Sequence, residues 1–126
     1  MKKIITAAGA PAALGPYSHA VQAGQLVYIS GQIPLDPVSG KLVEGDIEAE
    51  ARQVFKNIKA VLNAAGADFS HVVKTTVFLT DLADFAVVNG IYAETYTENP
   101  PARACVQVAA LPAGARVEIE AIAYIG

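Results

Sequence analysis

The sequence has a single cysteine, no tryptophan, and few charged side chains. Cys105 has no second thiol with which to form an internal disulfide, a pattern typical of proteins from a reducing cytoplasm. No signal peptide is visible, and no apolar run approaches the roughly 18 to 20 residues that span a bilayer. We therefore expect a cytoplasmic protein that does not insert into a membrane.

Ligand motifs are also scarce. His19 and His71 do not have the neighbours of a metal site, and no glycine-rich phosphate loop follows a strand-like segment. The nine Lys and Arg residues are scattered, and the net charge is −3, which argues against a nucleic-acid partner. The sequence thus predicts no metal, no cofactor and no nucleic-acid surface.

Apolar residues are abundant by contrast. They make up 53% of the 126 residues, whereas charged residues make up 17%, below the roughly 25% of a typical soluble domain. A small monomer with so few charges has difficulty covering its surface with polar groups. Because no segment is long enough for a membrane, we expect the surplus to lie in a subunit interface of a homo-oligomer.

The periodicity of the apolar residues predicts one domain over residues 1–126 with the order β-β-α-β-α-β-β. The segment 19–31 alternates as two short strands around Ala23-Gly24, and residues 33–45 are a loop. An apolar stripe predicts a helix that Asp46 caps and Gly66 ends. The other predicted elements are a strand over 71–80, a helix over 82–96, and strands over 103–109 and 116–125. This order predicts an α+β fold with both helices on one face of a mixed sheet.

The last two predicted strands carry polar residues that alternate with apolar ones. Arg103, Cys105 and Gln107 share one face of the first strand, and Glu118 and Glu120 share one face of the second. If the "LPAG" segment closes a hairpin, these two sets are cross-strand neighbours on the same sheet face. The alternative is an ordinary solvated face with an ion pair.

Three further places are candidates for ligand contacts. Asn89 falls within the inward stripe of the second predicted helix, where a buried amide either joins structural elements or contacts a ligand. Ser30 and Gly31 end a strand, where glycine allows a ligand to approach the backbone, although a plain bend is equally consistent. Tyr17, in "GPYS", is either a ligand contact or an unremarkable exposed aromatic residue.

Several motifs together resemble the RidA family, reactive intermediate deaminase A. They are "GPYSHAV", "ISGQIPLDPVSGKLV", "VVKTTVFLTDLADFAVVN" and "PARACVQVAALPAGARVEIEAIA", and the likeness extends from about residue 4 to 125. The resemblance implies a chorismate-mutase-like two-layer fold and a homotrimer with a ligand cleft between neighbouring subunits. It also implies hydrolysis of 2-imino acids and their enamine tautomers, which PLP-dependent threonine and serine dehydratases release.

The resemblance also implies a role for each candidate residue. Arg103 would hold the substrate carboxylate, because a guanidinium presents two parallel N–H donors that lysine lacks. Glu118 would position the attacking water, the backbone around Ser30-Gly31 and Cys105 would complete the pocket, and Tyr17 and Asn89 would line the cleft. No cofactor is implied, since imine hydrolysis needs orientation, a water molecule and a proton acceptor.

One departure from the family pattern concerns the loop before Arg103. Family members usually have a longer loop with an aromatic residue immediately before "PAR", whereas here "TENPPAR" is shorter and Pro100 takes that place.

A non-catalytic sensor that binds 2-keto acids through the same pocket is the alternative function. It requires Arg103 but not Glu118. An RNA-cleaving role, attached to relatives, is disfavoured by the acidic balance.

Overall fold

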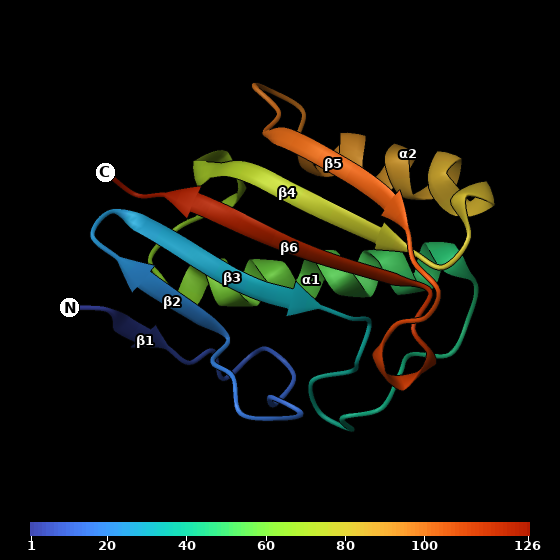
Figure 1. Ribbon diagram of the computed structural model, residues 1–126, viewed down its shortest axis with the longest axis horizontal. Coiled ribbons are helices and arrows are strands. Elements are labelled where there is room, and N and C mark those ends of the chain that lie inside the picture. The colour runs from blue at the N-terminus through green and yellow to red at the C-terminus, as the bar shows by residue number, and fades with distance from the viewer.

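The computed structural model describes all 126 residues as two α-helices packed on one face of a mixed six-stranded sheet (Figure 1). The strands lie in the order β1-β2-β3-β6-β4-β5. The strands are β1 (Lys3–Ile5), β2 (Ala20–Ala23), β3 (Leu26–Gln32), β4 (Val72–Leu79), β5 (Ala102–Gln107) and β6 (Val117–Tyr124). The helices are α1 (Ile47–Ala64) and α2 (Phe85–Thr95), with short 3-10 turns η1 (Phe69–His71), η2 (Leu82–Asp84) and η3 (Pro112–Gly114).

The predicted α+β class and the two helices on one sheet face are confirmed. The hairpin of β2 and β3 turns at Gly24, as expected, with Gly24 at a φ of 62°. The sequence did not predict β1, because three residues are too few to show an alternation. No helix is both long and apolar enough to cross a membrane.

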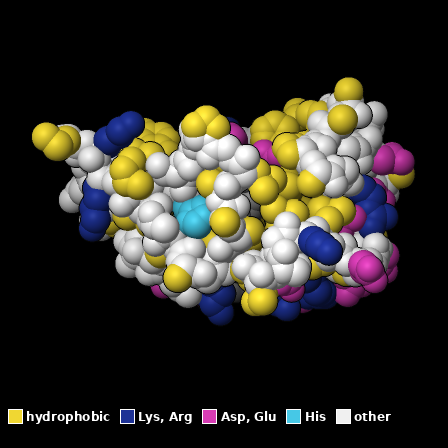
Figure 2. Space-filling model, turned by 90° about the horizontal axis from the view of Figure 1, so that it is seen from below, with side chains coloured by type: hydrophobic (Ala, Val, Ile, Leu, Met, Phe, Trp, Pro, Cys, Tyr) yellow, Lys and Arg dark blue, Asp and Glu magenta, His cyan; other side chains and the backbone are white.

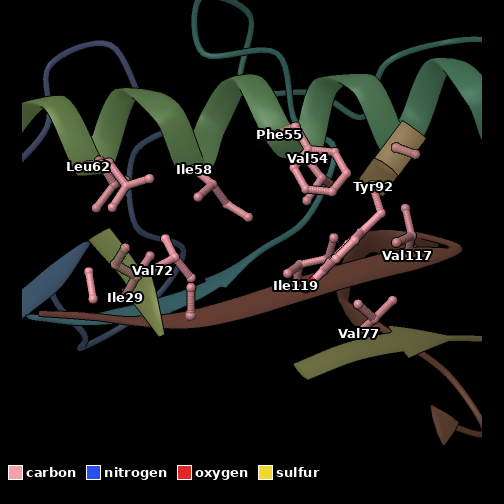
Figure 3. Close-up of a cluster of buried hydrophobic side chains, with 14 of the residues drawn as sticks. Ile29, Val54, Phe55, Ile58, Leu62, Val72, Val77, Tyr92, Val117 and Ile119 are labelled. Atoms are coloured by element: carbon pink, nitrogen blue, oxygen red, sulfur yellow. The ribbon is translucent and has the colours of Figure 1, made fainter. Parts of the chain in front are cut away.

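The helix α1 begins and ends where the sequence indicates. The Asp46 side chain accepts a hydrogen bond from the Ala49 amide at 3.0 Å, and Gly66, just beyond the helix, has a φ of 76°. Its apolar stripe points at the sheet (Figure 3). The core lies between the two layers, with these residues labelled in the figure: Ile29, Val54, Phe55, Ile58, Leu62, Val72, Val77, Tyr92, Val117 and Ile119.

The predicted hairpin between the last two strands is wrong. β6 pairs antiparallel with β3 and β4, while β5 pairs only with β4, in parallel. The reason is the crossover through α2, which returns the chain to the free edge of β4 in the same direction. The "LPAG" segment is therefore not a tight turn. It carries η3, with Ala113 at a φ of 59°, and leads the chain from the sheet edge to its centre.

Buried polar side chains attach two loops to α1. The Asn57 side chain is fully buried and donates to the carbonyl oxygens of Ile33 and Leu35 at 3.1 and 3.0 Å. The buried Glu50 carboxylate accepts a hydrogen bond from the Arg116 amide at 2.9 Å and pairs with the Arg116 guanidinium. Both loops therefore keep a constant position against the end of the sheet where β3 ends and β6 begins.

We expect Arg116→Ala to destabilise the protein by on the order of 1.5–3 kcal/mol, because it removes the charged partner of a buried carboxylate. The matched control is Arg52→Ala, which removes an exposed guanidinium that pairs with Glu48 and Glu94. Both of these ion pairs are exposed to water, which screens them, so the control should change the free energy of unfolding little. Urea unfolding at one protein concentration measures both; equal losses would contradict the assigned role of Glu50.

Candidate functional site

The predicted site residues lie on both faces of the sheet, which corrects the expectation that they share one face. In the parallel ladder Arg103 lies beside Thr75 and Cys105 beside Val77, so both face the helices. In the antiparallel ladder Glu118 lies beside Phe78 and Glu120 beside Thr76, on the open face. Side chains alternate along β4, so the guanidinium and the two carboxylates, which pair with odd and even positions of that strand, lie on opposite sides of the sheet.

The Arg103 side chain is held over α2. Its Nη1 donates to Asn89 Oδ1 at 2.7 Å, and its guanidinium carbon lies 4.7 Å from the centre of the Tyr92 ring and 5.4 Å from that of Phe85. Stacking on aromatic faces holds a guanidinium while leaving its edge N–H groups accessible. The Tyr92 hydroxyl is itself fixed by a 2.7 Å hydrogen bond with the buried Thr75 hydroxyl.

Asn89 is exposed, which corrects the expectation of a buried amide. Its function in the fold is to orient the guanidinium through one hydrogen bond. Arg103 makes no ion pair within the chain, whereas the other two arginines, Arg52 and Arg116, each pair with a carboxylate. Four of its five N–H donors are thus without a side-chain acceptor, and an external carboxylate is the natural partner.

A hollow of about 380 Å³ adjoins this guanidinium, and we name it the arginine hollow. Its lining residues are Asn89, Tyr92, Ala93, Tyr96, Pro100, Pro101 and Arg103. Pro100, at the start of the "PPAR" segment, is therefore part of its wall. The hollow combines a cation with aromatic and proline surfaces, which suits a small carboxylate with an apolar side chain.

On the open face, Glu118 lies over a bulge in β3. Ile29 pairs with Ala121 and Gln32 pairs with Ile119, so Ser30 and Gly31 together occupy the place of one residue. A Cβ atom on Gly31 would be 2.9 Å from the Glu118 carboxyl carbon and closer still to its oxygen. Any other residue at this position would require the Glu118 carboxylate to move.

The surroundings of Glu118 form a second hollow, of about 420 Å³, which we name the glutamate hollow. It is lined by Leu14, Tyr17, Ser30, Gly31, Ile33, Pro112, Glu118 and Glu120. Burial, and next the negative charge of Glu120, raise the pKa of the Glu118 carboxyl. A carboxyl with a raised pKa, set in a hollow, is suited to exchange a proton with a ligand or a water molecule.

Viewed from below, apolar side chains gather where the loops after β3 and before β6 lie (Figure 2). A small buried cluster of Ile33, Leu35 and Ala115 joins these two loops. Since Ile33 and Pro112 belong to these loops and line the glutamate hollow, the cluster supports one of its walls.

Cys105 lines neither hollow. It is half-buried on the helix side of β5, and burial raises the pKa of its thiol, although the nearby Arg103 charge opposes this. A protonated thiol is a weak nucleophile. Gln107, the third polar residue of β5, accepts a hydrogen bond from the Leu82 amide and so helps to hold η2.

The structure thus brings Arg103 and Asn89 together in one hollow, and Tyr17, Ser30, Gly31 and Glu118 in the other. Sequence reasoning did not identify Phe85 and Tyr92 as the platform for Arg103. Their spacing of seven residues, with Asn89 between them, places all three on one side of α2 and is the signal that could have identified it.

Comparison with known proteins shows to which family this chain belongs. The family model described as endoribonuclease L-PSP matches residues 7–125. The chain belongs to this family.

Two relatives of the L-PSP family match over nearly their whole lengths. The mouse protein named 2-iminobutanoate/2-iminopropanoate deaminase is 56% identical over 100% of this chain and 93% of its own length. The DfrA protein of Myxococcus xanthus is 58% identical over 97% of this chain and 95% of its own.

The crystal structure of RidA from a Psychrobacter species has a TM-score of 0.94 at 54% identity, covering 98% of this chain and 99% of that one. The resemblance to the RidA family is confirmed. The family model spans both helices and strands β2 to β6.

We expect Glu120→Gln to lower the pKa of Glu118 toward that of an ordinary glutamate, because the substitution removes a like charge that disfavours ionisation. Titration of the side-chain carboxyl carbons by NMR measures this directly. An unchanged Glu118 titration would mean that burial alone raises its pKa.

Proposed function

We propose that this protein hydrolyses 2-imino acids, such as 2-iminobutanoate and 2-iminopropanoate, and their enamine tautomers. The products are the 2-keto acid and ammonia. Each turnover consumes one water molecule, forms a C–O bond at C2 and breaks the C–N bond. The names of the mouse, human and bovine relatives, at 54–56% identity over the full chain, support this reaction.

The observation that carries the proposal is the chemistry of the two hollows. One contains an arginine that has no carboxylate partner within its chain, and the other contains a carboxyl with a raised pKa. A 2-imino acid needs both, since its carboxylate requires a fixed cation and its C2 carbon requires an activated water molecule. The two groups lie on opposite sheet faces of one chain, so a single chain cannot apply both to one small substrate.

We infer that the active site is shared between subunits of a homotrimer, with the β5 edge and arginine hollow of one subunit facing the glutamate hollow of its neighbour. Three large side chains on the open face support a partner there: Tyr28, Val106 and Tyr124 are each between 42% and 47% exposed. Exposed aromatic and apolar residues on one sheet face are typical of an oligomer interface.

In this site Arg103 binds the substrate carboxylate through two N–H groups, and Asn89 with Tyr92 keeps the guanidinium in place. Tyr17, Ser30 and Gly31 surround the carbon that reacts, and Cys105 supports β5 behind the arginine. The Glu118 carboxylate accepts a proton as water adds to C2. Glu118 passes this proton to the imine nitrogen, and the hydroxyl proton of the tetrahedral intermediate then follows it to the same nitrogen, so that ammonia leaves as the carbonyl forms.

No cofactor takes part in this scheme. The substrates are short-lived in water, so an enzyme that produces 2-imino acids must supply them. PLP-dependent threonine and serine dehydratases release such imines, which makes them the proposed functional partners.

We expect Arg103→Lys and Glu118→Gln to fail in different ways. Lysine retains the charge but loses the paired donors and the aromatic stacking, so affinity for 2-ketobutyrate should fall roughly ten- to a hundredfold. Glutamine retains shape but cannot accept a proton from water, so hydrolysis should fall by on the order of 10²–10⁴ while 2-ketobutyrate still binds. Calorimetry measures binding, and a coupled threonine dehydratase assay, corrected for spontaneous hydrolysis, measures turnover.

Two controls accompany these variants. Cys105→Ala should retain most activity, because the thiol lies outside both hollows. Glu120→Gln should be milder than Glu118→Gln. If the wild-type protein does not accelerate imine hydrolysis while Arg103→Lys loses 2-ketobutyrate binding, the protein is a 2-keto-acid sensor rather than an enzyme.

A mixture of subunits tests the shared site. We expect inactive Arg103→Lys and Glu118→Gln proteins, unfolded together and refolded in equal amounts, to regain activity. In a cyclic trimer each mixed assembly has one interface with both native residues, so random mixing should restore about a quarter of wild-type activity. Absence of any recovery in trimers shown by mass spectrometry to be mixed would place both residues in one subunit's site.

A further inference from the structure

The segment that carries Tyr17 has little structure of its own. Residues 6–19 contain no helix or strand, yet Leu14 and Tyr17 from this segment line the glutamate hollow. Within the segment the Tyr17 hydroxyl accepts a hydrogen bond from the Leu14 amide at 3.2 Å, which links these two lining residues. The position of both must therefore depend on contacts that attach the segment to the sheet.

His19 makes one such attachment, immediately before β2. Its Nδ1 accepts a hydrogen bond from the Ala7 amide at 2.9 Å, and its Nε2 lies 2.8 Å from the Pro11 carbonyl oxygen. An amide can only donate and a carbonyl can only accept, so the ring is neutral, with its proton on Nε2. The ring is 8% exposed, and it joins both ends of the 7–11 turn to the residue that immediately precedes β2.

Ser30 makes the second attachment. Its hydroxyl donates to the Ser18 carbonyl oxygen at 2.6 Å, and its amide donates to the His19 carbonyl oxygen at 3.0 Å. The chain that carries Leu14 and Tyr17 is therefore held at Pro11 by His19 and at Ser18 by Ser30. Losing either attachment leaves one end of this stretch free.

We propose that His19 is a positioning residue, which keeps Tyr17 and Leu14 over the glutamate hollow by bridging Ala7 and Pro11. The role in catalysis rests on the proposed function, because Tyr17 matters only if substrate occupies that hollow. The bridge needs one acceptor and one donor on a buried side chain. Leucine has similar volume but neither group, whereas the glutamine amide has both.

Hydrogen exchange tests the attachment independently of any activity. We expect His19→Leu to accelerate exchange of the Ala7 and Leu14 amides, and His19→Gln to restore their protection. Val61→Ala, a truncation in the fully buried part of α1, is the control for general loss of stability and should leave these two amides protected relative to the rest of the chain. Unchanged protection in His19→Leu would overturn the attachment.

Steady-state kinetics tests the consequence. We expect His19→Leu and Tyr17→Ala each to raise KM by on the order of tenfold with kcat less affected, and the double variant to be no worse than either one. His19→Gln and Val61→Ala should retain the wild-type KM. Multiplying effects in the double variant, or an unchanged KM in His19→Leu, would overturn the positioning role.

The two proposals fail separately in these experiments. A wild-type protein without imine hydrolysis would overturn the proposed reaction alone. The same five variants would then be compared by their affinity for 2-ketobutyrate, with the same expected ranking. Equal affinity in all of them would overturn the positioning role as well.

Discussion

The parallel pairing of β5 with β4 is the constraint on which the site depends. Side chains alternate along a strand, and neighbours in a ladder share a face, so this pairing directs Arg103 toward the helices. There the guanidinium stacks on Tyr92 and Phe85 and bonds to Asn89, all from α2. An antiparallel hairpin with β6 would have placed the same guanidinium near Glu118, where the two charges would neutralise each other. Separation on opposite faces leaves each available for a ligand.

The glutamate hollow depends on a different device, an irregularity in β3. The bulge at Ser30 and Gly31 makes space for the Glu118 carboxylate. Because Gly31 has no side chain, the carboxylate can lie directly against its backbone. The loops around the hollow are attached by buried polar groups: His19 and Ser30 hold one side, while Asn57 and Glu50 hold the other. Ser30, Asn57 and Glu50 join loop backbone to a strand or helix, and His19 joins it to the residue immediately before β2, so the hollow is attached to the core of the domain.

The three arginines and their neighbouring carboxylates fall into groups with different roles in the structure. Glu50 and Arg116 connect layers, and Arg52 and its partners are exposed between the helices. Arg103 and Glu118 serve neither purpose. Glu118 loses hydration by burial and has no cation partner, which is costly for stability. The placement of Arg103 at an open sheet edge and of Glu118 on an open face is consistent with a site completed by another subunit.

Much of the fold follows from the sequence, because its signals are local. The 3.6-residue stripe between Asp46 and Gly66 and the alternation in residues 19–31 depend only on neighbours along the chain, and the helix and hairpin form as these patterns predict. The motif around Arg103 likewise identifies the family and the candidate residues. Three features were decided by the tertiary structure alone. They are the insertion of β6 between β3 and β4, the stacking of Arg103 on α2, and the attachment of the Tyr17 segment by His19. Strand order and side-chain contacts arise between residues far apart in sequence. The periodicity of apolar residues shows which side of a helix or strand is buried, but it carries no information about which other element that side contacts.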